Sequence, residues 1–147
     1  MRAPRGFTLI EVVIALLIGS ILTSIALTGF GNARGRFAVR GARNTFVSLH
    51  ARARAAAIEG GTTARLTVYP SGDSVTIVRG GTTLESIRFG EEFDVDVQAS
   101  ANVVLCMSSR GYALDTCNSF SSPVRVTFAF GADTASVQIL PMGQLVY

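Results

Sequence analysis

The chain begins with its longest apolar stretch. From Val12 to Ala33 there are 22 residues without one charged side chain. At about 1.5 Å per residue, a helix of that length covers the roughly 30 Å hydrocarbon core of a bilayer. The pattern therefore predicts a transmembrane helix in the first part of the chain.

The hydrophobic spacing changes after Gly31 to Gly35, which mark the end of the apolar stretch. Apolar residues then recur at intervals of three and four, the spacing of one face of an amphipathic helix. Two consecutive glycines, Gly60 and Gly61, predict the end of this helix. The predicted apolar face consists of Val39, Ala42, Phe46, Leu49, Ala53 and Ala56.

Beyond Gly61 apolar and polar residues alternate, as in strands that are buried on one face. Turns rich in glycine and proline separate the alternating runs, so we expect antiparallel hairpins. The whole pattern predicts an α+β fold, in which a long N-terminal helix packs on an antiparallel β-sheet or sandwich. The predicted strands lie around residues 64–68, 75–77, 84–89, 93–97, 103–107, 124–130, 135–139 and 145–147.

One carboxylate, Glu11, directly precedes the charge-free stretch. An acidic side chain at a membrane-length apolar segment is costly to bury and usually has a partner, which makes Glu11 a candidate functional residue. The alternative is a signal-anchor helix in which Glu11 merely marks the headgroup boundary.

The residues around Glu11 carry a family resemblance. The run Arg5-Gly6-Phe7-Thr8-Leu9-Ile10-Glu11 resembles the class III signal of type IV prepilins and type II secretion pseudopilins. The resemblance implies that a prepilin peptidase cuts between Gly6 and Phe7 and that Phe7 is then N-methylated. It also implies that Glu11, the fifth mature residue, pairs with the N-terminal amine of an adjacent subunit.

The signal and the charges predict the same topology. A secretory signal has its cleavage site after the apolar region, whereas Gly6 precedes it, so the helix should stay in the mature protein. Arg2 and Arg5 favour the cytoplasmic side, so we expect a single-pass inner-membrane protein with its C-terminal domain outside the cytoplasm. The expected segments are a leader (1–6), a transmembrane or fibre-core helix (7–30), its amphipathic continuation (31–60) and a β domain (61–147).

The outer domain resembles, less specifically, the GspH/FimT branch of minor pilins and pseudopilins. The resemblance rests on the alanine-rich helix end at 55–61, the glycine-punctuated strands and the closing strand after Gly143. Thr28 stands where many type IV pilins have proline, and the chain lacks the basic ending of some FimT-like proteins of DNA uptake. The expected function is that of a pilus or pseudopilus subunit, with DNA binding in DNA uptake as the alternative.

A basic stripe lies beside the predicted apolar face of the second helical pattern. Charge on such a stripe can bind nucleic acid or lipid headgroups, but solvated arginines on an amphipathic helix are commoner. His50 has no Ser, Cys or acid at a catalytic spacing, so we assign it to the same solvated face. The residues of the stripe are Arg36, Arg40, Arg43, His50 and Arg54.

The two cysteines, Cys106 and Cys117, fall in the part assigned to the oxidising side, with ten residues between them. This spacing predicts a disulfide, and two unpaired buried thiols are the alternative. A zinc site would need more ligands than two cysteines and one distant histidine. The formal charge of +3 overstates the basicity of the mature protein, because cleavage removes Arg2 and Arg5 and leaves a side-chain balance of +1.

The chain has no Gly-x-Ser-x-Gly, phosphate-loop or His-Glu-x-x-His motif and no lysine. The acidic run from Glu91 to Asp96 could hold calcium or serve in acid–base chemistry, but its alternation with apolar residues indicates the polar side of a strand. We therefore expect no enzyme activity, cofactor or metal. The expected partners are prepilin peptidase, other pilin or pseudopilin subunits and the inner membrane, with DNA as the alternative.

Overall fold

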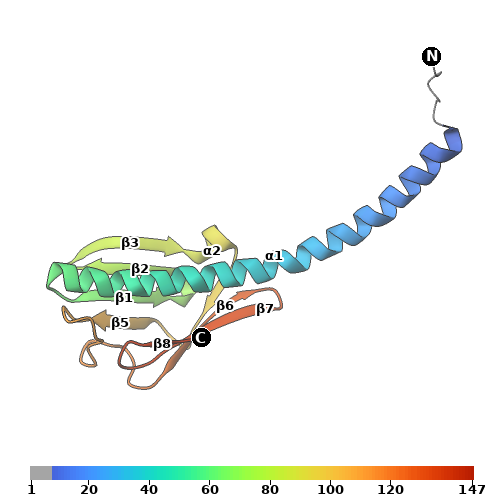
Figure 1. Cartoon of the computed structure of the whole chain (residues 1–147). Helices are drawn as coiled ribbons and strands as arrows, with labels where there is room; N and C mark the ends of the chain where they lie inside the picture. The colour runs from blue at the N-terminus through green and yellow to red at the C-terminus, as the bar shows by residue number, and fades with distance from the viewer. Residues whose placement is uncertain (1–7) are drawn as a thin grey trace, which may run out of the picture. The chain divides into compact units, whose positions relative to one another are not determined.

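The structure, a computed structural model, describes residues 8–147, and the side chains of residues 26–32 lie outside the description. The chain divides into two compact units: the first ends at Arg34, and the second comprises Gly35–Tyr147. The long helix α1 contributes to both units, and all strands belong to the second (Figure 1). The elements are α1 (Leu9–Gly60), β1 (Ala64–Tyr69), η1 (Pro70–Gly72), β2 (Ser74–Arg79), β3 (Thr82–Arg88), α2 (Phe89–Phe93), β4 (Asp96–Gln98), β5 (Val103–Met107), β6 (Val124–Phe130), β7 (Asp133–Ile139) and β8 (Leu145–Val146).

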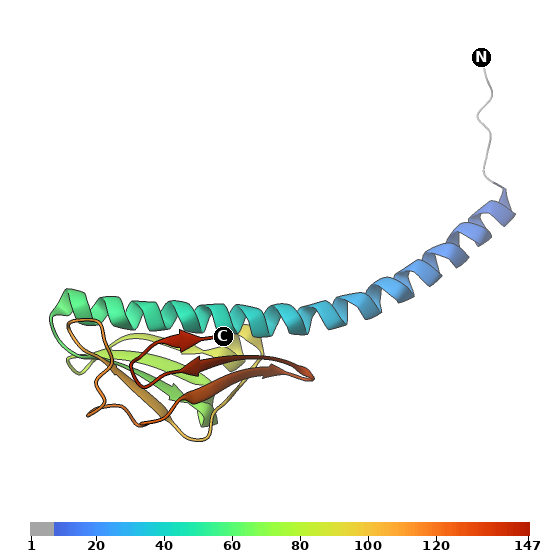
Figure 2. The same cartoon turned by 60° about the horizontal axis from the view of Figure 1, so that its bottom comes forward.

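The strands form two antiparallel sheets of four strands each, with the orders β3-β2-β1-β5 and β4-β6-β7-β8. In the first sheet Leu66 pairs with Ile77 across the β1–β2 hairpin. In the second sheet Val126 pairs with Val137 across the β6–β7 hairpin. The part of α1 that belongs to the second unit lies along these strands (Figure 2). The predicted α+β class with antiparallel sheets is therefore confirmed.

The core lies between α1 and the two sheets. Phe46 of α1 and Phe128 of β6 have ring centroids 5.7 Å apart, and the Phe128 centroid is 5.2 Å from that of Phe89 in α2. The predicted apolar face of α1 is buried from Val39 to Ala53. Its last buried member is Ala57 rather than the predicted Ala56, because Ala57 continues the i+4 spacing from Ala53.

The end of α1 is capped by a side chain from β2. Arg79 Nη1 donates a hydrogen bond to the carbonyl oxygen of Ala56 at 3.0 Å, and α1 has no basic residue in its own last turn. A Cβ atom at Gly60 would lie 2.8 Å from Arg79 Cδ, so the glycine leaves room for this side chain. Gly61 then leaves the helix with φ +62°, which confirms the predicted stop.

The segment from Phe89 to Gln98 differs from the prediction, in which one strand ends at Phe89 and the next begins at Phe93. Phe89–Phe93 form the short helix α2, and β4 contains only Asp96–Gln98. The two phenylalanines are four residues apart and stack with centroids 5.8 Å apart, which a helical turn allows and an extended strand does not. Asp94, at φ 58°, ends this turn.

The predicted disulfide between Cys106 and Cys117 is present, with the two Cα atoms 5.8 Å apart. Asn118, which directly follows Cys117, fixes the end of the enclosed loop through two hydrogen bonds. The Cys106 N–H donates to Asn118 Oδ1 at 2.9 Å, and Asn118 Nδ2 donates to the Pro141 carbonyl at 3.2 Å. The loop thus connects β5, at the edge of the first sheet, with the segment that precedes β8.

Candidate assembly site

The first unit presents apolar side chains on every side of α1. Every Val, Ile and Leu between Leu9 and Ile25 is exposed, from 48% at Val12 to 82% at Leu9. A helix that is apolar around its whole circumference is typical of surroundings of lipid or of other apolar groups.

Among the residues that the structure describes, no helix has the length and hydropathy needed to cross a membrane. The predicted transmembrane segment therefore stays a prediction.

The hydroxyl groups of this half of α1 bond within the helix itself. Ser20 Oγ donates to the Leu17 carbonyl and Thr23 Oγ1 to the Gly19 carbonyl, both at 2.8 Å. Side chains that bond back to the preceding turn need no water or external partner. These polar residues are thus compatible with apolar surroundings.

Glu11 lies in the first turn of α1, where its N–H donates to Thr8 Oγ1 at 3.3 Å. Thr8 and Glu11 match the Thr-x-x-Glu pattern of a capping box, a helix-start signal that the sequence-based prediction of this site did not use. Within residues 8–147 no cation lies within ion-pair distance of the Glu11 carboxylate. The predicted cleavage and methylation site, Gly6 and Phe7, lies outside the described residues.

Three of the predicted basic residues line a groove of about 450 Å³ beside β7. Arg36 Nε is 3.8 Å from Asp133 Oδ1. The guanidinium carbon of Arg43 lies 5.5 Å from the centroid of the Tyr147 ring, a cation–π distance. Arg40 is exposed and has no ion-pair partner among the described residues.

The fourth, Arg54, does not line this groove: it lies at the Cys106–Cys117 loop, where a Cβ atom on Gly111 would be 3.0 Å from Arg54 Nε. Two of the four arginines, Arg36 and Arg43, already interact with other side chains of the chain. The carboxylate of Asp133 offsets the charge of Arg36, whereas the neutral ring of Tyr147 leaves the charge of Arg43 uncompensated.

The prediction that His50 belongs to the solvated face is wrong. His50 is only 9% exposed, and its Nε2–H donates to the carbonyl oxygen of Gly143 at 2.8 Å. It follows Phe46 by four residues and precedes Ala53 by three, which places it on the buried side of α1. Burial lowers the pKa of His50 below 6.5; the hydrogen bond to Gly143 opposes this shift, and the charge of Arg54 adds to it.

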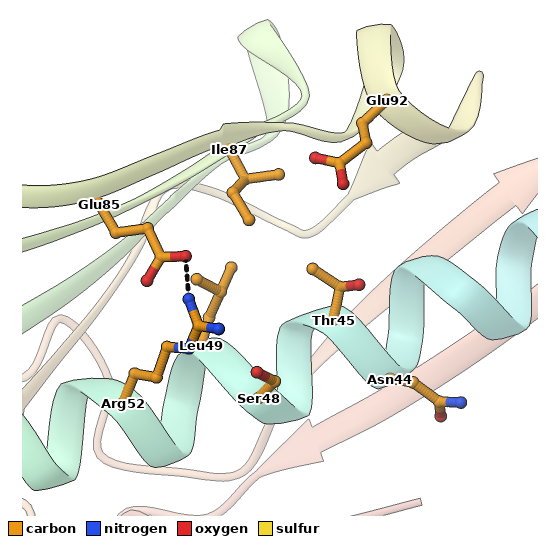
Figure 3. A pocket seen from close by; sticks show the side chains of 8 residues that line it. All are labelled: Asn44, Thr45, Ser48, Leu49, Arg52, Glu85, Ile87 and Glu92. Carbon is orange, nitrogen blue, oxygen red and sulfur yellow. Dashed lines mark hydrogen bonds and ion pairs between the residues drawn. The ribbon is translucent and has the colours of Figure 1, made fainter.

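A second groove, of about 420 Å³, lies between α1 and β3, the edge strand of the first sheet (Figure 3). Ile87 and Glu92 point into it from one side, and Thr45 and Leu49 face them from α1. One end is bridged by an ion pair in which Arg52 Nη1 is 2.5 Å from Glu85 Oε1. The sequence offered no signal for this groove, because α1 and β3 are joined only in the tertiary structure.

The acidic run from Glu91 to Asp96 is divided between two elements, so it does not form the polar side of one strand. Glu91 pairs with Arg88 at 2.7 Å, and Asp96 begins β4. Among the residues that the structure describes, no group of three or more His, Cys, Asp or Glu side chains could hold a metal ion.

Comparisons with known proteins identify the N-terminal part of the chain. Residues 1–27 match the family model of the prokaryotic N-terminal methylation motif. Neither the curated proteins nor the solved structures gave a match. The matched range contains the basic leader, the Gly6–Phe7 junction and Glu11, the residues on which the predicted resemblance rests. The chain therefore carries a type IV pilin-like N-terminal methylation motif.

Proposed function

We propose that this protein is a minor pilin or pseudopilin, a structural subunit of a type IV pilus or type II secretion pseudopilus. The observation that carries the proposal is the methylation motif at residues 1–27 together with the exposed apolar side chains from Leu9 to Ile25. Apolar surface costs about 25 cal/mol per Å² in water, so this half of α1 needs a cover. Lipid covers it before assembly, and equivalent helices cover it in the fibre.

Processing precedes assembly in this proposal. Prepilin peptidase removes residues 1–6, and Phe7 becomes the methylated N-terminus. The second unit then lies outside the cytoplasm, and its Cys106–Cys117 disulfide is the kind of bond that an oxidising compartment allows. No step of this function requires the protein to be an enzyme.

Glu11 directs the subunit into the fibre. Its carboxylate becomes buried when neighbouring helices cover α1, and a buried carboxylate without a partner costs several kcal/mol. The N-terminal amine of an adjacent subunit supplies the cation, because Phe7 precedes Glu11 by only four residues and neighbouring helices are shifted along the fibre axis.

The experiment compares Glu11→Gln with the wild type in a host that makes the fibre. Gln has almost the shape of Glu and lies outside the cleavage junction, so cleavage and membrane insertion should persist. Loss of a charge pair that contributes about 1.4 kcal/mol would reduce incorporation about tenfold. The measurement is the amount of subunit in sheared fibres relative to that in the membrane.

Thr23→Val is the matched control, since it removes a polar group that bonds only to the Gly19 carbonyl in the same helix. We expect incorporation of this variant to be unchanged. Equal incorporation of Glu11→Gln and wild type would contradict the role of Glu11.

DNA binding during DNA uptake is the second candidate function, and the groove lined by Arg36, Arg40 and Arg43 is the observation that favours it. Binding of duplex DNA by the full-length protein in detergent would have to weaken steeply with salt. In that case Arg40→Gln should lower the affinity and reduce the salt slope by about one. If the protein shows no salt-sensitive binding of DNA, the structural function is the one candidate that remains.

A further inference from the structure

Phe37 lies on the solvent-facing side of α1 in the second unit. It is 73% exposed, whereas the other phenylalanines from Gly35 to Tyr147 are buried or half-buried. Phe37 therefore adds nothing to the core of its own chain. Exposed aromatic side chains of this kind are enriched among the anchors of protein interfaces.

The groove between α1 and β3 has the size and the lining to receive such a ring. Its volume of about 420 Å³ lies within the range of roughly 300–1,000 Å³ that is usual for binding pockets. The half-buried Ile87 supplies apolar surface beside the buried Leu49, and Thr45 and Ser48 line the opening with small polar groups (Figure 3). This combination of an apolar floor and a polar rim is the usual anatomy of an anchor pocket.

The charges beside the two features are complementary. Arg40 follows Phe37 by three residues, so the two residues are neighbours on the surface of α1. Glu92 points into the groove (Figure 3). Within the described residues, neither Arg40 nor Glu92 has an ion-pair partner.

We infer that Phe37 of one copy of this chain inserts into the groove between α1 and β3 of a second copy, where Arg40 of the first pairs with Glu92 of the second. The two patches are different surfaces of one unit, so the contact is heterologous. The inference rests on the proposed function, because it names a contact between subunits of the fibre.

The test introduces the photo-reactive residue p-benzoylphenylalanine in place of Phe37 in the full-length chain, in cells that assemble the fibre. Irradiation should give a dimer of this chain whose linked peptide contains residues 44–52 or 85–92. The same residue in place of Tyr112, which is 44% exposed on the disulfide loop, is the control and should give no dimer.

Charge exchange then separates pairing from damage to the fold. Arg40→Glu and Glu92→Arg should each lower the dimer yield at least about fivefold, and the double variant should restore at least half of it. A double variant as poor as the single ones would overturn the inference. So would cross-links to lipid, to a different protein or to another surface of the second copy.

Intact mass in the same samples keeps this inference distinct from the proposed function. Cleaved protein that is present in fibres but gives no cross-link at the groove refutes the second-copy contact alone. Protein that retains residues 1–6 refutes the proposed function, whatever the cross-links show.

Discussion

The two halves of α1 use their apolar residues in different ways. Between Leu9 and Ile25 every large apolar side chain is exposed, whereas from Val39 to Ala57 the apolar side chains of one face are buried against the two sheets. The first half is apolar at every angle around the helix, and the second half is apolar along one stripe. The spacing of the apolar residues, more than their number, therefore distinguishes the half of α1 that packs in the core from the half whose apolar side chains stay exposed.

The largest expected effect comes from truncating a core side chain of the second half. Phe46→Ala removes a fully buried ring that contacts Phe128, and such substitutions lower the free energy of unfolding by about 3–5 kcal/mol. Ile14→Ala, in the exposed first half, should change it by less than about 0.5 kcal/mol. Denaturant unfolding of the full-length protein in detergent, followed by near-UV circular dichroism, measures both. Similar losses for the two variants would remove the distinction between the halves.

Removal of the disulfide should have an intermediate effect that is confined to the second unit. Replacing Cys106 and Cys117 together by Ser should lower the free energy of unfolding by roughly 2–3 kcal/mol, the value for a loop of about this length. Non-reducing peptide mapping of the wild type should first show one linked pair. Free thiols in protein from its native compartment would contradict the prediction, and Ser109→Ala, at an exposed position of the same loop, is the control.

The smallest expected effect is a pH dependence from His50. Because its pKa is lowered in the folded state, the unfolded chain binds the proton more readily, and stability should fall as the pH drops below about 6.5. His50→Gln keeps a donor for the Gly143 carbonyl but does not titrate, so its melting temperature should fall less between pH 7.5 and pH 5. Equal falls for the two proteins would show that other groups cause the dependence.

The buried face and the end of α1 could be predicted from the sequence, since both depend on local patterns of residues. The i, i+3, i+4 spacing from Val39 predicted the buried face, and Gly60 and Gly61 predicted the helix end. The pattern at Phe89 and Phe93 predicts strands, whereas the structure has a helix there, because five residues are too few to distinguish a helical turn from alternation.

The tertiary contacts of the site were beyond the sequence patterns. The burial of His50 depends on the Gly143 carbonyl, 93 residues away, and the groove at Leu49 depends on where β3 lies beside α1. The Thr8–Glu11 capping box, by contrast, was present as a local signal. Long-range contacts thus account for what pattern reasoning missed at His50 and at the groove.

We propose that the first half of α1 is the assembly element of a processed fibre subunit. Its most direct test is the intact mass of the protein purified from a host that contains prepilin peptidase. We expect a chain that begins at Phe7 and carries one methyl group on its amine, with the whole apolar segment retained. A chain that still carries residues 1–6, or one that is cut after the apolar segment, would contradict it.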